Sequence, residues 1–235
     1  MIFKKINPEN YKRIVFFTGA GMSAESGIPT YRGEGGIWKE YRWEEYACQE
    51  AFEKQPEKVL KFHELRRTEA LKCKPHNGYR IISELQSLHT QTYIVTQNID
   101  GMHQRASLNN IIELHGSLWR LRCEFDNLTF NDLKAGTYET LKCDCGNWLR
   151  PDIIWFQDML EREVLSFANE IIGSCDLFIS IGTSSVVWPA AGYPKLAKSC
   201  GAFCIEINPE NTEISHIYDE NIRLPASKGL DLLFH

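Results

Sequence analysis

A glycine-rich loop follows a short apolar segment near the start of the chain. The segment RIVFFT at residues 13–18 leads directly into Gly19 and Gly21. Glycines at this spacing let the backbone turn sharply and approach a pyrophosphate, and a helix that begins there supplies N–H groups and a positive dipole end. The third glycine of the usual G-x-G-x-x-G motif is missing, because Ala24 occupies its place. The loop alone fits either a nucleotide site or an ordinary turn between a strand and a helix.

Polar residues that could act in catalysis stand just after two other strand-like segments. Gln97, Asn98 and Asp100 follow the segment TYIVT, and His115 follows IIEL. Parallel strands open at their carboxyl ends into a crevice that binds ligands, so these side chains can share a site with the glycine loop. Histidine has a pKa suited to a general base near neutral pH. An isolated histidine after a strand is nevertheless more often structural, and Asn-x-Asp is a common turn.

Four segments together match a set of family signatures in the family's order. They are residues 19–33 (GAGMSAESGIPTYRG, with Tyr31 where phenylalanine is usual), 96–103 (TQNIDGMH), 113–116 (ELHG) and 182–191 (GTSSVVWPAA). With Asn208 and the segment 225–227 (PAS), they resemble the signatures of the sirtuin family. Chance assembly of all these matches is negligible, although each one alone is weak. The resemblance implies an NAD-dependent protein-lysine deacylase, with NAD as co-substrate and acylated lysine peptides as partners.

The resemblance also assigns roles to single residues. His115 is the implied general base, and Asn98 and Asp100 hold the nicotinamide end of NAD and its ribose. Loss of nicotinamide leaves an oxocarbenium-like cation, which the amide oxygen of the acyl-lysine can trap if water is excluded. The base then activates a ribose hydroxyl, and the implied products are free lysine, nicotinamide and O-acyl-ADP-ribose. The residues assigned to NAD are Gly19, Ala20, Gly21, Ala24, Glu25, Thr30, Tyr31, Arg32, Trp38, Gln97, Asn98, Ile99, Asp100, His115, Gly182, Thr183, Ser184, Asn208, Pro209, Glu210 and Ala226.

His63 and Arg66 suggest a particular acyl group. They match the Tyr-x-x-Arg pair with which the small bacterial and mitochondrial desuccinylase-type sirtuins grip the distal carboxylate of succinyl and malonyl groups, with histidine in place of tyrosine. Their i, i+3 spacing puts both on one helix face. Arginine offers a carboxylate two parallel N–H groups, and histidine can donate a hydrogen bond and gain charge at lower pH. Ala47 matches a small residue that leaves room for a longer acyl chain. The alternative is that Arg66 and Arg67 belong to a solvated helical face.

The segment at residues 152–158 (DIIWFQD) resembles the strand to which the family's substrate peptide adds. Phe156 is expected to pack against the stem of the acyl-lysine. Gln157 stands where the family has glycine, so we expect the docking geometry to depart from the family pattern here.

Cys123, Cys143 and Cys145 resemble an incomplete version of the family's structural zinc site. The family holds zinc with two C-x-x-C pairs, whereas here Asp126 stands where the partner of Cys123 is expected and the second pair is shortened to C-x-C. Three thiols and one carboxylate could in principle fill a tetrahedron, but this pattern is a poor match to closed structural sites. We therefore expect a degenerate site without zinc.

Short apolar segments must position these residues. The strand-like ones are residues 13–18, 92–96, 111–114, 177–181, 202–207 and 221–224. Several are apolar on both faces, which is typical of buried parallel strands. Helical patterns at residues 75–88, 164–172 and 190–199 lie between them. Strands that alternate with helices indicate an α/β fold, a doubly wound Rossmann-like parallel sheet.

Two stretches interrupt this alternation. Residues 34–75 are rich in charge and aromatics, and residues 118–151 hold three cysteines among polar turn residues. We predict that both belong to one small inserted module, made of helices and a degenerate zinc-ribbon-like segment. Residues 1–33, 76–117 and 152–235 would then form the NAD-binding domain.

Composition narrows the class of protein. The hydrophobic fraction of 43% and the charged fraction of 24% are those of ordinary globular proteins, and the net charge of -5 argues against binding to nucleic acid or an anionic membrane. No apolar run approaches the roughly 20 residues that span a bilayer, and the first residues do not resemble a secretory signal. Eight cysteines in such a chain are typical of reduced thiols. We expect a cytoplasmic monomer without nucleic-acid or membrane partners.

Other functions could use the same pocket. An ADP-ribosyltransferase or an NAD glycohydrolase would consume NAD but would have less need of His115. A non-catalytic module that senses NAD would bind the dinucleotide without turnover. A plain dehydrogenase fits less well, because the acidic residues at the distance of a ribose-binding acid, Glu40 and Glu44, do not follow a strand.

Overall fold

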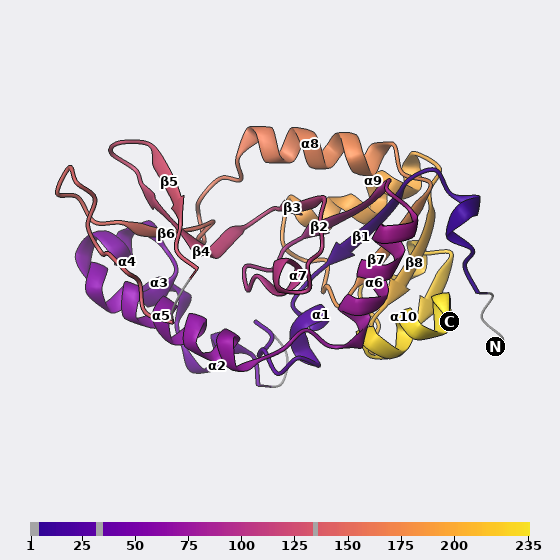
Figure 1. The fold of residues 1–235 in the computed structure, drawn as a ribbon, viewed down its shortest axis with the longest axis horizontal. Coiled ribbons are helices and arrows are strands. Elements are labelled where there is room, and N and C mark those ends of the chain that lie inside the picture. The colour runs from indigo at the N-terminus through magenta and orange to yellow at the C-terminus, as the bar shows by residue number, and fades with distance from the viewer. Residues whose placement is uncertain (1–4, 32–34, 134–135) are drawn as a thin grey trace.

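The protein has two lobes, and a parallel sheet of six strands forms the centre of the lobe on the right of Figure 1. Its strands are β1 (Ile14–Thr18), β2 (Thr92–Thr96), β3 (Ile111–Glu113), β7 (Leu177–Ile181), β8 (Phe203–Ile207) and β9 (Glu220–Ile222). They lie in the order β3-β2-β1-β7-β8-β9, so the chain starts at the centre, builds one edge and returns to build the other. This is the predicted doubly wound arrangement. The structure is a computed structural model, which describes residues 5–31, 35–133 and 136–235.

Side chains of β1 alternate between two hydrophobic cores, one on each face of the sheet. Ile14 and Phe16 belong to the core under α6 and α10, whereas Val15 and Phe17 belong to the core under α8 and α9. All four are fully buried, as the two-residue period of a covered strand requires. Figure 1 shows α8 above the sheet and α10 below it. These helices are α6 (Asn77–Leu88), α8 (Arg162–Gly173), α9 (Tyr193–Ser199) and α10 (Ala226–Phe234).

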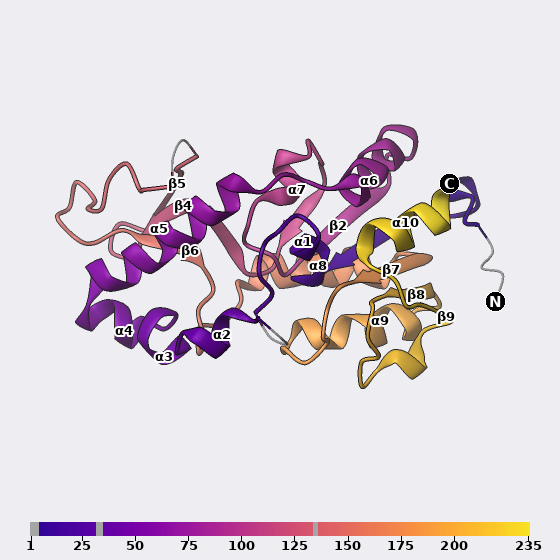
Figure 2. The same cartoon turned by 90° about the horizontal axis from the view of Figure 1, so that it is seen from below.

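A three-stranded antiparallel sheet forms the second lobe, on the left of Figures 1 and 2. Its order is β5-β4-β6, with β4 (Gly116–Cys123), β5 (Leu128–Asn131) and β6 (Arg150–Ile153). The helices of this lobe are α2 (Ile37–Glu40), α3 (Trp43–Tyr46), α4 (Gln49–Lys54) and α5 (Pro56–Lys72). Figure 2 shows α5 running diagonally beside the strands. Short helical turns complete the described chain at η1 (Pro8–Asn10), α1 (Gly21–Ala24), α7 (Met102–Arg105), η2 (Ala190–Gly192) and η3 (Ser215–Ile217).

Arg67 anchors α5 to the antiparallel sheet. Its side chain is fully buried, and its Nη2 donates to the Asp132 carboxylate at 2.7 Å. The guanidinium also lies 4.3 Å from the centre of the Tyr138 ring and 4.9 Å from that of Trp119. The alternative prediction from the sequence, that Arg67 lies on a solvated helical face, is therefore wrong. Burial is tolerated because the charge is paired and hydrogen-bonded.

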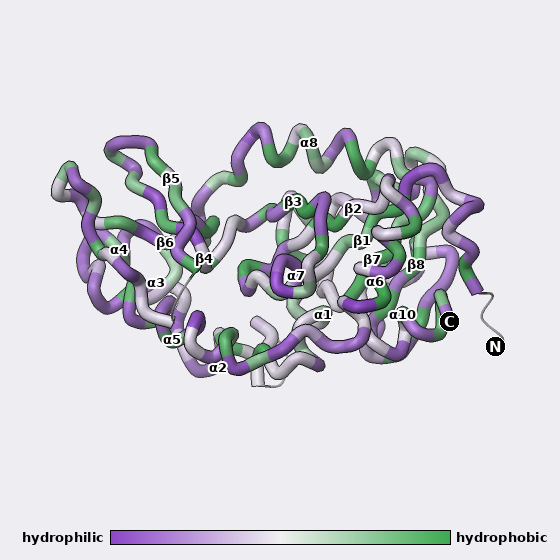
Figure 3. Tube along the Cα trace, in the orientation of Figure 1, coloured by the Kyte–Doolittle hydropathy of each residue, from purple (hydrophilic) through white to green (hydrophobic). Residues whose placement is uncertain are grey.

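The two lobes differ in how their apolar residues are distributed. Figure 3 shows hydrophobic residues concentrated along the parallel strands and interspersed with hydrophilic ones in the other lobe. Among the described residues, no helix is long and apolar enough to cross a membrane. The predicted division into two domains stays a proposal, and two of its boundaries, after residues 117 and 151, fall inside β4 and β6.

Candidate active site

A cavity of about 1000 Å³ lies at the carboxyl ends of the parallel strands and extends to the second lobe. Five residues that line it directly follow or closely follow β1, β2, β3, β7 and β8, and these are Gly19, Gln97, His115, Gly182 and Asn208. Residues of α5 close the other side. Open α/β sheets bind ligands in this position, at the point where the strand order reverses.

Most residues predicted to bind NAD line this cavity. They are Gly19, Ala20, Gly21, Ala24, Glu25, Thr30, Tyr31, Trp38, Gln97, Asn98, Ile99, His115, Gly182, Thr183, Ser184, Asn208, Pro209, Glu210 and Ala226. The four residues predicted to bind the acylated peptide, Ala47, His63, Arg66 and Phe156, line it too. Asp100 does not, and Arg32 lies outside the described residues. The individual roles of these residues stay predictions.

The glycines of the first loop bring two loops of the sheet into contact. A Cβ atom on Gly21 would lie 2.6 Å from the Cα of Gly182, and one on Gly19 would lie 2.8 Å from the Gly182 carbonyl oxygen. Gly182 itself has a φ of 58°, in the left-handed region that favours glycine. The N–H of Gly21 donates to the Gly182 carbonyl at 2.8 Å. Gly19 and Gly21 are therefore required largely because the two loops approach each other so closely, a contact that the local sequence does not reveal.

Asn98 and Asp100 are held by hydrogen bonds to the first loop. The Asn98 side-chain amide donates to the Gly19 carbonyl at 2.9 Å. The Asp100 carboxylate accepts from the Ser23 hydroxyl at 2.6 Å and from the Met102 N–H at 2.9 Å. Burial raises the pKa of Asp100, and these two hydrogen bonds oppose the rise. The carboxylate is thus turned toward the protein interior, which explains why it does not line the cavity.

Two residues of this network escaped the sequence prediction. The Tyr79 hydroxyl lies 2.8 Å from the Ser23 oxygen, and both side chains are fully buried. Because Ser23 gives its proton to Asp100, Tyr79 must donate to Ser23. Ser23 could have been singled out as a polar residue inside a family signature. Tyr79 carries no such signal, since it lies on the buried face of a helix.

His115 is arranged as a base. Its Nδ1 lies 3.0 Å from the Gln97 carbonyl oxygen. A carbonyl can only accept, so Nδ1 carries the hydrogen and Nε2 keeps its lone pair. Burial lowers the pKa of His115 below its usual value, although the hydrogen bond to Gln97 partly offsets this. The imidazole is consequently neutral at pH 7, with one nitrogen able to take a proton.

Further hydrogen bonds fix the loops around the cavity. Gln97 donates through its side-chain amide to the Thr183 hydroxyl at 2.9 Å, and the Asn208 amide donates to the Thr183 carbonyl at 3.1 Å. The Glu25 carboxylate accepts from both the N–H and the hydroxyl of Ser227 at 2.7 Å. These hydrogen bonds tie together loops from both halves of the sheet.

His63 and Arg66, the two residues predicted to grip the acyl carboxylate, differ in burial at the second-lobe end of the cavity. His63 is only 2% exposed, and burial lowers its pKa to about 3, with the charge of Arg66 adding to the effect. The gain of charge at lower pH that the sequence suggested for His63 therefore does not occur above about pH 3. Arg66 is half-buried, and none of the described carboxylates lies within ion-pair distance of it.

The peptide-docking segment contains an unusual backbone conformation. Gln157 has a φ of 76°, a left-handed value at the position where the family has glycine. This conformation costs a non-glycine residue about 1–2 kcal/mol. The neighbouring Phe156 donates its N–H to the Ala47 carbonyl at 3.0 Å, and its ring lies 4.8 Å from that of Trp43. Gln157 thus adopts a backbone conformation that favours glycine, at a cost in strain, and the expected departure of the docking geometry stays a prediction.

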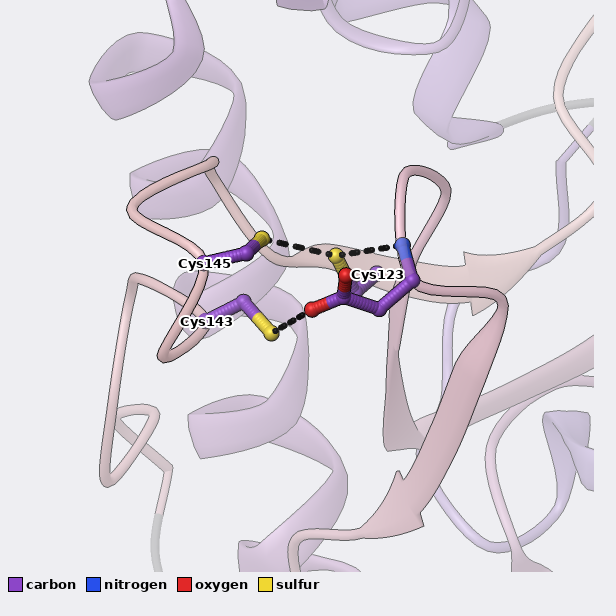
Figure 4. A group of neighbouring side chains, drawn as sticks. Cys123, Cys143 and Cys145 are labelled. Carbon is purple, nitrogen blue, oxygen red and sulfur yellow. Dashed lines mark hydrogen bonds between the residues drawn. The ribbon is translucent and has the colours of Figure 1, made fainter.

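The cysteine cluster brings four possible metal ligands together. The ligand atoms of Cys123, Asp126, Cys143 and Cys145 all lie within 4.8 Å of one another. The sulfurs of Cys123 and Cys145 are 3.6 Å apart, and the Cys143 sulfur is 3.1 Å from a carboxylate oxygen of Asp126 (Figure 4). A tetrahedral zinc ion with Zn–S bonds of ~2.3 Å needs sulfurs about 3.8 Å apart. The four residues therefore fit zinc in size and donor type, whereas the sequence pattern alone had favoured a site without it.

The family model for the Sir2 family matches residues 19–189, well over half of the chain. The matched part includes the glycine loop, Asn98, His115 and the loop after β7. The chain belongs to the Sir2 family. This confirms the resemblance to sirtuins, and the six-stranded parallel sheet confirms the predicted fold class.

Sir2 proteins similar to this chain are known from both sequence and structure. A protein of Aquifex aeolicus named NAD-dependent protein deacylase is 42% identical over 223 residues, which cover 94% of this chain and 93% of the relative. A mutant Sir2 homologue in complex with ADP-ribose matches with a TM-score of 0.90 and 42% identity, covering 95% of this chain and 90% of the other. A Sir2 homologue in complex with NAD matches with a TM-score of 0.88 and 42% identity, covering 96% and 89%.

Proposed function

We propose that the chain is an NAD-dependent protein-lysine deacylase that removes acidic acyl groups, succinyl and malonyl, as well as acetyl. The observation that carries the deacylase proposal is the state of His115. Its Nδ1–H is held by the Gln97 carbonyl, so an uncharged Nε2 is left for proton transfer in a cavity at the carboxyl ends of the sheet. A general base placed in this way is what transfer of an acyl group to a ribose hydroxyl requires.

The residues of the cavity fit NAD. A space of about 1000 Å³ is large enough for a dinucleotide. The glycine loop leaves the backbone at Gly19 and Gly21 free of side chains, so a pyrophosphate can approach it closely. Asn98 would lie toward the nicotinamide end, and Asn208 would lie toward the adenine ribose. The Sir2 homologues that match this chain with bound ADP-ribose and bound NAD support this placement.

The proposed chemistry divides between the co-substrate and the protein. When bound, NAD supplies the ribose carbon that the acyl oxygen attacks as nicotinamide leaves. His115 would take a proton from a ribose hydroxyl at Nε2, so that this oxygen bonds to the acyl carbon. The bond from that carbon to the lysine nitrogen would then break, with the proton passed on to the departing amine, and one water molecule would complete the O-acyl-ADP-ribose product. Asn98 would orient the nicotinamide end, and the aromatic walls around Trp38 and Phe156 would exclude water from the cation.

Arg66 supports the acidic-acyl part of the proposal. It lines the cavity on α5, is half-buried and carries a guanidinium whose polar neighbour is a hydroxyl rather than a carboxylate. A cation kept from full hydration without an anion favours a ligand that brings one. The distal carboxylate of a succinyl or malonyl group would do so.

Substitution of Arg66 by methionine tests the acyl preference. We expect Arg66→Met to lower kcat/KM for succinyl- and malonyl-lysine peptides by ~30- to 5,000-fold, because loss of one partner of a desolvated charge pair costs ~2–5 kcal/mol. Acetyl-lysine has no distal charge, so its kcat/KM should fall far less. Arg80→Met, which removes an exposed arginine on α6, is the matched control. Equal losses for acetyl and succinyl peptides would show that Arg66 only supports the fold.

A further inference from the structure

The cavity contains a second hydrogen-bond donor beside Arg66, and it comes from a different part of the chain. The hydroxyl of Tyr31 lies 3.4 Å from Nη2 of Arg66. The Arg66 guanidinium also lies 5.1 Å from the centre of the Tyr31 ring. The Tyr31 ring stacks on Trp38 with centroids 5.9 Å apart, and all three side chains line the cavity.

Tyr31 and Arg66 both keep N–H or O–H groups that can donate to a ligand. Arginine has only donors, so in the contact with Arg66 the Tyr31 oxygen accepts and its own O–H remains available. Among the described residues, no carboxylate or carbonyl is recorded as accepting from either group. Two donors that converge on one end of a cavity call for a ligand that only accepts, and a carboxylate is such a ligand.

His63, the residue that stands in sequence where a tyrosine partner is expected, is occupied elsewhere. The indole N–H of Trp155 lies 3.3 Å from Nε2 of His63. Indole can only donate, so His63 Nε2 must accept and has no hydrogen to offer. In the neutral ring Nδ1 therefore carries the hydrogen, and this nitrogen is buried and interacts with the backbone of Tyr46. His63 thus faces Trp155 with its acceptor nitrogen and the Tyr46 backbone with its N–H, so it is poorly placed to donate to a carboxylate.

Trp155 is itself firmly held in this position. Its ring lies 3.6 Å from the guanidinium of the buried Arg150, and its backbone N–H donates to Asp158 at 3.1 Å. Arg150 in turn donates to the same Asp158 oxygen at 2.8 Å. The hydrogen bond to His63 therefore comes from a rigid group, so reorientation of the His63 ring would break it without a replacement donor.

We infer that Tyr31, rather than His63, is the second residue that binds the distal carboxylate of an acidic acyl group, together with Arg66. The inference rests on the proposed function and names a specificity-determining residue of the same site. The hydroxyl of Tyr31 would take the role of the tyrosine that His63 replaces on α5. It contacts the same arginine, Arg66, from the loop after β1.

The test compares acyl selectivity, the ratio of kcat/KM for succinyl-lysine to that for acetyl-lysine, in wild type and four variants: Tyr31→Phe, His63→Leu, Arg66→Met and the double variant of Tyr31 and Arg66. Tyr31→Phe removes only the hydroxyl, and loss of a hydrogen bond to a charged group should lower the ratio by about 10- to 150-fold. Any effect on NAD acts on both peptides and cancels in the ratio. His63→Leu should change the ratio by no more than about threefold. Combined with Arg66→Met, Tyr31→Phe should add little, because both residues act on one carboxylate.

The outcomes separate the two proposals. If the wild type does not remove succinyl groups, the proposed acyl preference fails and this inference fails with it. If the wild type removes them and Tyr31→Phe keeps the wild-type ratio, only the assignment of Tyr31 is wrong. A loss of selectivity in His63→Leu but not in Tyr31→Phe would return the role to His63. Thermal melts of each variant show whether the His63 substitution leaves the fold intact, and the Tyr31 result stands without it.

Discussion

At the scale of single residues, the properties that matter come from partners far apart in the sequence. The family signature identifies His115 as a base, but only the Gln97 carbonyl decides which of its nitrogens is free. In the same way, the sequence offers His63 as the partner of Arg66. The structure instead pairs His63 with Trp155 and Arg66 with Tyr31, over separations of 92 and 35 residues. Motifs therefore predict which residues gather at the site, and tertiary contacts determine their protonation and orientation.

The lowered pKa of His115 predicts how activity depends on pH. Catalysis requires the unprotonated imidazole, and burial moves the pKa of His115 below the usual 6.5. The acid limb of the kcat/KM profile should therefore lie below pH 6.5, with activity retained as the pH falls from 7 toward that value. A pH–rate profile with saturating NAD checks this. An acid limb at or above pH 6.5 would contradict the assignment of the base.

At the scale of elements, the parallel strands could be predicted closely and the antiparallel sheet could not. The strand expected at residues 92–96 is β2, because a continuous apolar run is typical of a strand covered on both faces. The strand β4 pairs with β6 across about 30 residues, and β5 is exposed along its whole length. Apolar and polar residues do alternate in Trp119–Cys123 and in Leu128–Asn131, but these runs are short and nothing in them identifies the distant strand with which they pair. The small lobe is instead held by specific polar contacts such as the pair of Arg67 and Asp132.

Loss of the buried Arg67 should destabilise the protein strongly. Arg67→Met leaves the buried Asp132 carboxylate without its cation, which typically costs about 3–5 kcal/mol. Urea unfolding of wild type and variant measures the difference in free energy of unfolding. Arg80→Met is the control, because its pair with Glu84 is exposed and should contribute less than about 1 kcal/mol. Similar small losses in both variants would show that the buried pair does not anchor α5.

The cysteine cluster makes a prediction about metal content. Because the four ligand groups fit a tetrahedral ion, we predict one zinc per chain, tying Cys123 and Asp126 to residues 143–145. Removal of zinc with a chelator should lower the melting temperature by about 4–8 °C, which corresponds to about 2 kcal/mol for a chain of this size.

Substitution of one ligand provides the matched control for that measurement. Asp126→Ala should reduce the zinc content, whereas Cys200→Ser, which alters an exposed cysteine outside the cluster, should not. If metal analysis finds no zinc and the chelator has no effect, the prediction from the shortened C-x-C pair, a degenerate site without zinc, is correct.

At the scale of the whole molecule, the doubly wound sheet and the second lobe together make the site. The parallel sheet provides five loops at its carboxyl edge, and α5 of the second lobe closes the cavity with Arg66 and His63. The sheet could be predicted from alternating apolar segments. The closure of the cavity could not, because it depends on how two lobes pack and not on a pattern within either one.

The central claim is that the chain couples consumption of NAD to removal of an acyl group, and release of nicotinamide tests it most directly. Nicotinamide should appear when NAD and an acyl-lysine peptide are both present, in a one-to-one ratio with deacylated peptide, and hardly at all with NAD alone. His115→Ala should lower the rate of deacylation by ~100- to 10,000-fold while leaving NAD binding largely intact. Nicotinamide released equally well without peptide would indicate an NAD glycohydrolase, and NAD binding without any release would indicate a sensing module. Either result would contradict the account.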